Sequence, residues 1–254
     1  MTKSLFDCGY KVIDVGDGVE LDAVRSDIFE LAKSIFNLPN INANEGFNYF
    51  HTYLQGYSLG DINQKRFELI SEINQKLKVN ERMFKSFKED ITKNIGFDVL
   101  SQKGCNFVMQ VPGDPNPSEL HRDAPPNSLF ELVLWVPLVN AYKSKSMYIL
   151  NKESTKLAYS KLGEFKNWEG FEKYCRTLAK IIDVPYGKAI IFHPSLLHGS
   201  DINTEKETRI SLNMRFKNFF APQGLKNQLQ FFEILELSDW TKLGLEAEKR
   251  RILK

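Results

Sequence analysis

The chain has 254 residues, of which 34 are Lys or Arg and 32 are Asp or Glu, so its formal charge at pH 7 is +2. This near balance excludes a strong field that would attract nucleic acid or an anionic membrane. The length suffices for a sizeable core, and no apolar run approaches the roughly 20 residues that span a bilayer. We therefore predict one domain, residues 1–254, with no nucleic-acid or membrane partner. The oligomeric state stays open.

The cysteines and the N-terminus predict the compartment. Cys8, Cys105 and Cys175 are an odd number without metal-type spacing, which is typical of reduced, mostly buried thiols. The first ten residues, MTKSLFDCGY, lack the long apolar segment of a signal peptide. Both features predict a cytoplasmic protein.

Residues 1–97 are predicted to be helical. Apolar residues recur at helical spacing over Leu21–Phe36. A second helix is predicted from Asp61, its expected N-cap, to Leu77, and a third from Glu81 to Asn94, before Gly96.

Strand patterns begin near residue 98. Short segments rich in Val, Ile and Phe, separated by turn formers, predict strands at 105–112, 129–139, 146–151, 179–184, 188–193 and 207–218. A helix is predicted at 161–178, and the tail, 221–254, is predicted to be helical from residue 227. Helices followed by a block of strands favour either an α+β fold or a mainly β barrel over 98–220 that is buttressed by helices.

Residues 208–218, TRISLNMRFKN, show the clearest alternation in the chain. Arg209, Ser211, Asn213 and Arg215 alternate with apolar residues, so one strand face is polar and the other is apolar. The polar face either meets water or lines a cavity while the apolar face packs on the N-terminal helices. Because those helices need a sheet to cover, the second interpretation is favoured.

Two histidines and one carboxylate lie in this block of strands. His121 and Asp123 are two residues apart, so on an extended segment they point to the same side. His198 follows another strand and lies eleven residues before Arg209 (209 − 198 = 11). Such a set can form the facial triad of non-haem Fe(II) oxygenases. The three positions that a triad leaves open can take a bidentate 2-oxo acid and O2, and a nearby arginine can hold the acid's far carboxylate.

The remaining candidates are less specific. His193 competes with His198 as a ligand but lies sixteen residues before Arg209 (209 − 193 = 16). His51 lies in an aromatic-rich loop, where it is either structural or at a pocket mouth, and Arg122 is expected to form a structural salt bridge. The roles of His51, His193 and Arg215 stay open.

The order of the motifs resembles that of the 2-oxoglutarate- and Fe(II)-dependent dioxygenases, particularly the phytanoyl-CoA dioxygenase-like branch. The matching elements are His121-Arg122-Asp123, Trp135-Val136-Pro137-Leu138, Leu197-His198-Gly199-Ser200 and Arg209-Ile210-Ser211, within roughly residues 100–220. The resemblance implies a double-stranded β-helix, a cupin-like jelly-roll core with flanking helices. It implies Fe(II) on His121, Asp123 and His198, and the 5-carboxylate of the co-substrate 2-oxoglutarate on Arg209 and Ser211.

Two further residues alternate on the strand before His121. Asn106 and Gln110 could face the interior and bind the co-substrate's C1 carboxylate or the substrate, although a solvated edge strand gives the same pattern. The branch often carries a Gly-rich strand that ends in Pro-Gly-Ser-His, and residues 145–154 here, KSMYILNKES, lack its glycines. This departure puts the branch's substrate pocket in doubt.

The predicted function is a dioxygenase that uses Fe(II), 2-oxoglutarate and O2 on a small molecule. A fainter resemblance to oxygenases of bacterial carbohydrate-biosynthesis clusters implies hydroxylation of a small polar metabolite, such as a sugar or nucleotide sugar. Desaturation or epimerisation would use the same chemistry. The alternatives are a cupin-like, metal-dependent sugar isomerase or epimerase and a non-catalytic sugar-binding jelly roll.

Overall fold

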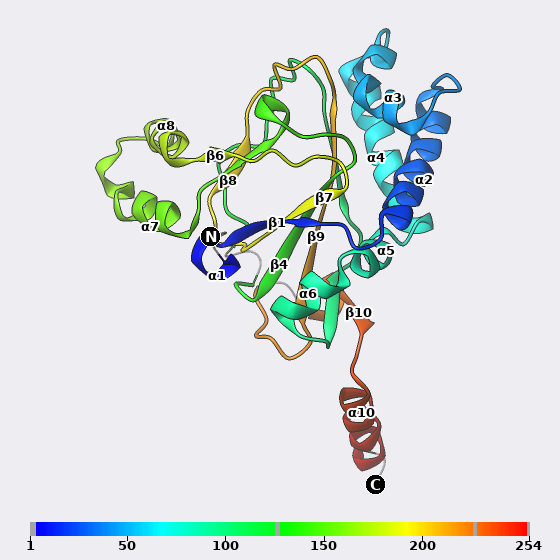
Figure 1. Ribbon diagram of the computed structural model, residues 1–254, viewed down its shortest axis with the longest axis vertical. Coiled ribbons are helices and arrows are strands. Elements are labelled where there is room, and N and C mark those ends of the chain that lie inside the picture. The colour runs from blue at the N-terminus through cyan, green and yellow to red at the C-terminus, as the bar shows by residue number, and fades with distance from the viewer. Residues whose placement is uncertain (1–3, 125–127, 226–227, 253–254) are drawn as a thin grey trace.

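The computed structural model describes residues 4–124, 128–225 and 228–252, and places two antiparallel sheets against each other (Figure 1). The larger sheet has the strand order β1-β7-β4-β9-β2-β10, with β3 also paired to β9. The smaller sheet has the order β6-β5-β8. The strands of the larger sheet are β1 (Tyr10–Asp14), β2 (Val99–Gln102), β3 (Asn106–Gln110), β4 (Glu131–Pro137), β7 (Lys188–Phe192), β9 (Arg209–Asn218) and β10 (Phe232–Glu236). Those of the smaller sheet are β5 (Met147–Ile149), β6 (Lys180–Ile181) and β8 (His198–Ser200).

Strand β9 is the centre of the larger sheet, because it pairs with β4 on one side and with β2 and β3 on the other. Its apolar residues are fully buried and belong to the main hydrophobic core, together with residues of the N-terminal helices. Its polar residues Arg209, Ser211 and Arg215 are also buried, and Asn213 is half-buried. The polar face therefore lies inside the protein, and the interpretation that it meets bulk water is wrong.

The N-terminal helices cover the outer face of the larger sheet (Figure 1). They are α2 (Gly18–Phe36), α3 (Ala43–Asn48), η1 (Phe50–Leu54), α4 (Leu59–Lys76), α5 (Val79–Ser86) and α6 (Lys88–Ile95). A short helix, α1 (Leu5–Cys8), precedes β1. The connection from β5 to β6 holds α7 (Lys152–Ser160), η3 (Leu162–Glu164) and α8 (Trp168–Leu178), of which α7 and α8 pack against the smaller sheet. Another short turn is η2 (Lys143–Lys145).

The C-terminal segment adds one strand to the larger sheet before its last helix extends away from the sheets. After α9 (Gln228–Phe231), strand β10 pairs with β2, and α10 (Asp239–Ile252) projects away from the sheets (Figure 1). No helix in the described part of the chain is long and apolar enough to cross a bilayer. The division into residues 1–97, 98–220 and 221–254 stays a prediction.

Several predicted elements differ from the structure. Residues 1–97 contain strand β1, paired with β7, and the predicted tail helix contains β10. The N-cap of α4 is Ser58, whereas Asp61 is the third helical residue, whose carboxylate completes the capping box. The predicted helix 81–94 is two helices that break at Phe87, and the insertion has a helix, α7, before the predicted one. The part of the tail prediction that falls on residues 226, 227, 253 and 254 lies outside the described residues.

The packing of β9 on the helices should contribute a large share of the stability. Leu212 is fully buried in the main core, so Leu212→Ala should lower the free energy of unfolding by about 2–5 kcal/mol. Urea denaturation measures this change. The control, Val19→Ala, removes methyl groups from a side chain that is 81% exposed and should change stability by less than about 0.5 kcal/mol. Equal effects of the two substitutions would contradict the packing described here.

Candidate metal centre

Two histidines meet because their strand segments pair. His121 and His198 form an isolated antiparallel bridge, in which each backbone N–H donates to the other's carbonyl at 2.9 Å. Directly paired residues of an antiparallel ladder point to the same side. Their rings accordingly lie with centroids 4.2 Å apart.

The residue after His198 must be small. A Cβ atom on Gly199 would lie 2.5 Å from the Tyr148 hydroxyl oxygen and 2.8 Å from the Ser118 carbonyl oxygen. Glycine therefore lets β8 lie closely between β5 and the segment that leads to His121. This close packing sets the position of His198 relative to His121.

Asp123 completes the group. The nearest distance between its Oδ1 and Nε2 of His121 is 3.8 Å, and one ligand atom from each of His121, Asp123 and His198 lies within 4.8 Å of the others. Among residues 4–124, 128–225 and 228–252, this is the one group of three or more His, Cys, Asp or Glu side chains close enough to share an ion. The structure thus brings together the three residues that the sequence predicted as ligands.

Backbone carbonyls orient both imidazoles. Nδ1 of His121 lies 2.7 Å from the carbonyl oxygen of Glu119, and Nδ1 of His198 lies 2.9 Å from that of Leu196. Because a carbonyl can only accept, each Nδ1 carries the proton and each Nε2 keeps its lone pair. This is the arrangement in which histidine ligates a metal.

The two histidines differ in exposure. His198 is buried and packs against the Phe192 ring, whereas the His121 side chain is 42% exposed. Burial, and then the neighbouring His121 ring, lower the pKa of His198, so its neutral, metal-binding form prevails at neutral pH. The centre therefore has one deep side and one side open to solvent at His121.

Arg215 holds the carboxylate. Its guanidinium lies 2.9 Å from Oδ1 of Asp123, and a second nitrogen donates to Oε1 of Gln102 at 2.9 Å. Both charged side chains are nine-tenths buried, so the pair has little competition from water. The sequence placed Arg215 on the polar face but left its role open, because nothing local links β9 to residue 123.

The predicted co-substrate residues share one face. The register sets Gln110 opposite Arg209, Val108 opposite Ser211, and Asn106 opposite Asn213, so their side chains lie on one face of the sheet. Gln110 is buried and donates to the carbonyl of Asp201, whereas Asn106 lies at the exposed end of β3. Arg209 is 5% exposed and crosses to the smaller sheet, where it donates to the Ser146 carbonyl at 3.4 Å.

Other predicted candidates lie outside this group. His193 binds the Ser195 hydroxyl and the Leu129 carbonyl through its two ring nitrogens, so it does not compete with His198. Arg122 lies over the Tyr159 ring at 4.9 Å instead of forming the expected salt bridge. His51 bonds the Thr208 hydroxyl at 2.9 Å, which gives it a structural contact.

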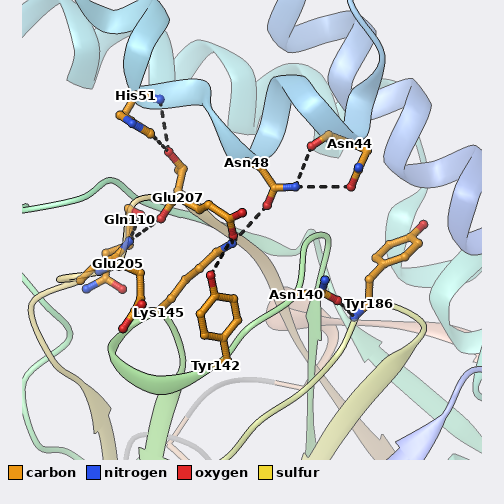
Figure 2. Close-up of polar contacts among 12 residues, drawn as sticks. Asn44, Asn48, His51, Gln110, Asn140, Tyr142, Lys145, Tyr186, Glu205 and Glu207 are labelled. Atoms are coloured by element: carbon orange, nitrogen blue, oxygen red, sulfur yellow. Dashed lines mark hydrogen bonds and ion pairs between the residues drawn. The ribbon is translucent and has the colours of Figure 1, made fainter.

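A polar network holds the loop before Arg209 (Figure 2). The ammonium group of Lys145, which is fully buried, bonds Glu207 at 2.6 Å and Asn48 at 3.1 Å. The backbone N–H of Thr208 donates to the Asn48 carbonyl at 2.7 Å, and its hydroxyl bonds His51. Helix α3 and the η1 turn thereby fix the residue that precedes Arg209.

Comparison of the chain with known proteins and solved structures supports the fold described above. No protein-family model matches the sequence, and no curated protein matches it. Among solved structures, iron-bound EctD from S. alaskensis has a TM-score of 0.57 and 12% identity, with 91% of this chain and 80% of that chain covered. HygX from Streptomyces hygroscopicus, with nickel and 2-oxoglutarate bound, has a TM-score of 0.52 and 11% identity, with 86% of each chain covered. SnoK, a non-haem, 2-oxoglutarate-dependent carbocyclase from nogalamycin biosynthesis, has a TM-score of 0.51 and 16% identity, with 92% of each chain covered.

At such low identity these similarities show the architecture alone. The chain has an antiparallel, sheet-rich fold with flanking helices, similar to the jelly-roll folds of non-haem oxygenases. The phytanoyl-CoA dioxygenase-like branch stays a prediction, and a closed cupin barrel is not observed: in the described residues, β3 pairs with no strand other than β9.

The ion pair of Asp123 predicts a metal-dependent stability. Arg215→Leu leaves the Asp123 carboxylate buried beside an apolar group, so in metal-free buffer it should lower the free energy of unfolding by about 3–5 kcal/mol. A bound divalent cation would supply the missing positive charge. Co(II) should therefore stabilise Arg215→Leu more than it stabilises the unsubstituted protein, as measured by urea unfolding with and without the ion. Equal stabilisation of both would show that the ion does not reach Asp123.

Proposed function

We propose that the protein is a non-haem, Fe(II)- and 2-oxoglutarate-dependent dioxygenase whose iron is held by His121, Asp123 and His198. The observation that carries the proposal is that these three ligand atoms lie within 4.8 Å of one another, with Arg209 buried on the same face of β9 as Arg215, the partner of Asp123. Two neutral imidazoles and one carboxylate suit Fe(II) and leave adjacent positions open. Two proteins of similar fold bind such groups: EctD holds iron, and HygX holds nickel together with 2-oxoglutarate.

The interior around Arg209 suits a dicarboxylate. Burial lowers the pKa of Arg209 to about 10, so the side chain stays cationic at neutral pH while it lies out of water. Its Nε, the Ser211 hydroxyl and Oε1 of Gln110 are buried without a hydrogen-bond partner among the described residues. A cation buried beside unsatisfied polar atoms is costly. A carboxylate would accept hydrogen bonds from the Arg209 guanidinium and the Ser211 hydroxyl, whereas Oε1 of Gln110 is itself an acceptor and needs a donor. We assign the far carboxylate of 2-oxoglutarate to Arg209 and Ser211, with Gln110 beside them.

Iron and 2-oxoglutarate, when bound, would supply O2 activation with release of succinate and CO2, and thereby oxidation of a substrate C–H bond. The chain's own residues act by position. Arg215 orients the Asp123 carboxylate, the Glu119 and Leu196 carbonyls orient the rings, and the buried side of His198 excludes water.

The proposed substrate is a small polar metabolite such as a sugar or nucleotide sugar. Asn106 and Asn213 are opposite each other on the inner face, about 13 Å along the strand from Arg209. Their amides can donate to and accept from hydroxyl groups. Asn106 lies at the exposed end of β3, which suits contact with a substrate or with the C1 carboxylate. Hydroxylation is the expected outcome.

The assignment of Arg209 predicts how 2-oxoglutarate binding changes when this residue is substituted. Anaerobic Fe(II) protein titrated with 2-oxoglutarate should develop a weak visible charge-transfer band. Arg209→Gln should raise the half-saturating 2-oxoglutarate concentration at least about tenfold, a loss of about 1.4 kcal/mol, without loss of iron binding. The control, Arg122→Gln, alters an arginine next to the ligands that faces Tyr159 and should leave the titration unchanged.

If the unsubstituted protein binds iron but develops no band, the dioxygenase assignment is wrong. A metal-dependent isomerase on the same fold would then be the better-supported assignment. Iron occupancy that stays unchanged in Asp123→Ala would instead indicate a non-catalytic binding protein.

A further prediction concerns the turnover of 2-oxoglutarate to succinate. Succinate release, measured across a panel of sugars, nucleotide sugars and acyl-CoAs, should rise above the substrate-free rate with a member of the first two classes. His198→Ala removes a ligand and should abolish that increase, whereas His193→Ala should retain it because His193 lies outside the group of ligands. Stimulation by acyl-CoAs alone would overturn the proposed substrate class.

A further inference from the structure

We infer that 2-oxoglutarate reaches Arg209 through a cleft beside helix α4, separate from the solvent-exposed side of the metal centre, and that Arg66 draws it in. The inference rests on the proposed function, because it concerns the co-substrate of that site. The cavity, called here the α4 cleft, has a volume of about 630 Å³. It is lined by Leu59, Ile62, Asn63 and Arg66 of α4, by residues 108–118 and by Arg209.

The α4 cleft passes around the edge of β3 into the interior. Its walls include Val108 and Gln110, which lie opposite Ser211 and Arg209 on the inner face, and Met109 from the outer face. Within the described residues, β3 has a strand partner on one side alone. The other wall is the segment at Ser118, whose carbonyl accepts from Ser200 of the smaller sheet. The cleft therefore lies at the free edge of β3, between α4 and the segment that leads from this strand to the smaller sheet.

The α4 cleft leads to Arg209 and not to the metal centre. Arg209 lines it, and none of His121, Asp123 and His198 does. The metal centre has its own exposure through the His121 side chain, which is 42% exposed. The site of the far carboxylate and the metal thus open to solvent in different places, so the co-substrate need not pass the position of the substrate.

The charges of the α4 cleft suit a dianion. Arg66 is half-buried in its wall and has no hydrogen bond or ion pair with any residue that the structure describes. The acidic residue of the lining is Asp114, whose carboxylate accepts from the Asn116 backbone N–H at 3.0 Å. Two arginines against one aspartate leave the cleft net positive. A cleft of one charge sign raises the rate at which opposite charges enter it.

The neighbouring Lys65 provides a matched control. It belongs to the same helix, its ammonium group bonds the Ile35 carbonyl at 2.5 Å, and it does not line the α4 cleft. Removing either charge changes the net charge of the protein equally. A difference between the two variants would therefore report position and not total charge.

The first experiment measures association. Stopped-flow absorbance of the charge-transfer band, with anaerobic Fe(II) protein, gives the association and dissociation rate constants of 2-oxoglutarate. Arg66→Gln should slow association about threefold or more at low salt, with a smaller salt dependence, whereas Lys65→Gln should match the unsubstituted protein. Equal rates in Arg66→Gln and Lys65→Gln would overturn the role of Arg66.

The second experiment obstructs the route. Ile62→Trp places a larger ring in the α4 cleft, and should slow association and dissociation by similar factors while the equilibrium constant changes little. Dissociation is measured by displacement with excess succinate. Phe67→Trp, on α4 at a position that is 75% exposed and outside the cleft, is the control. An unchanged equilibrium constant also shows that the variant is folded.

The outcomes separate the two proposals. A band that forms in Ile62→Trp at the rates of the unsubstituted protein would overturn the route and leave the dioxygenase assignment intact. Iron-loaded, unsubstituted protein that forms no band would overturn both.

Discussion

The burial of two arginines on one face of β9 is the constraint on which the rest of the structure depends. Moving a guanidinium from water into the protein interior costs several kcal/mol, by the order of magnitude known for buried ions. A buried guanidinium therefore needs an anion or several hydrogen-bond acceptors. Arg215 has its anion in Asp123 and a further acceptor in Gln102. Arg209, six residues earlier on the same face (215 − 209 = 6), has among the described residues a single long bond, to a backbone carbonyl. The contrast divides the interior into a region whose buried charges are paired and a region with unsatisfied polar atoms, to which the proposed co-substrate would bind.

The same strand explains why the two arginines can be buried at all. Its apolar face packs fully against the N-terminal helices, and a shift of one residue in register would exchange that face for the charged one. Pairing with β4 over seven positions and with β3 over five opposes such a shift. The candidate metal centre has weaker strand pairing: β8 has three residues, and the bridge between His121 and His198 joins segments 77 residues apart (198 − 121 = 77). Arg215 connects this weakly paired region to the strongly paired one, through the carboxylate of Asp123.

Alternation and motif order predicted the parts of the fold and of the candidate site that local patterns encode. The two faces of β9, the helix over Leu21–Phe36 and the grouping of His121, Asp123 and His198 agree with the structure. Strands β1, β8 and β10 were not predicted, because they are short or lie at the edge of a sheet, and their pairing partners decide their conformation. The partner of Arg215, and the lack of a partner for Arg66 among the described residues, depend on contacts between distant segments. No spacing in the sequence reports such contacts.

The N-terminal helices do more than cover a sheet. Helix α3 and the η1 turn hold Thr208, the residue before Arg209, through Asn48 and His51 (Figure 2). Burial lowers the pKa of Lys145, which joins Asn48 to Glu207 in the same network, but its ion pair with Glu207 opposes that shift. Helix α4 then forms one wall of the α4 cleft. The helical region therefore fixes the position of the Arg209 guanidinium from one side and borders the α4 cleft, so changes in these helices would affect Arg209 before they affected the group of His121, Asp123 and His198.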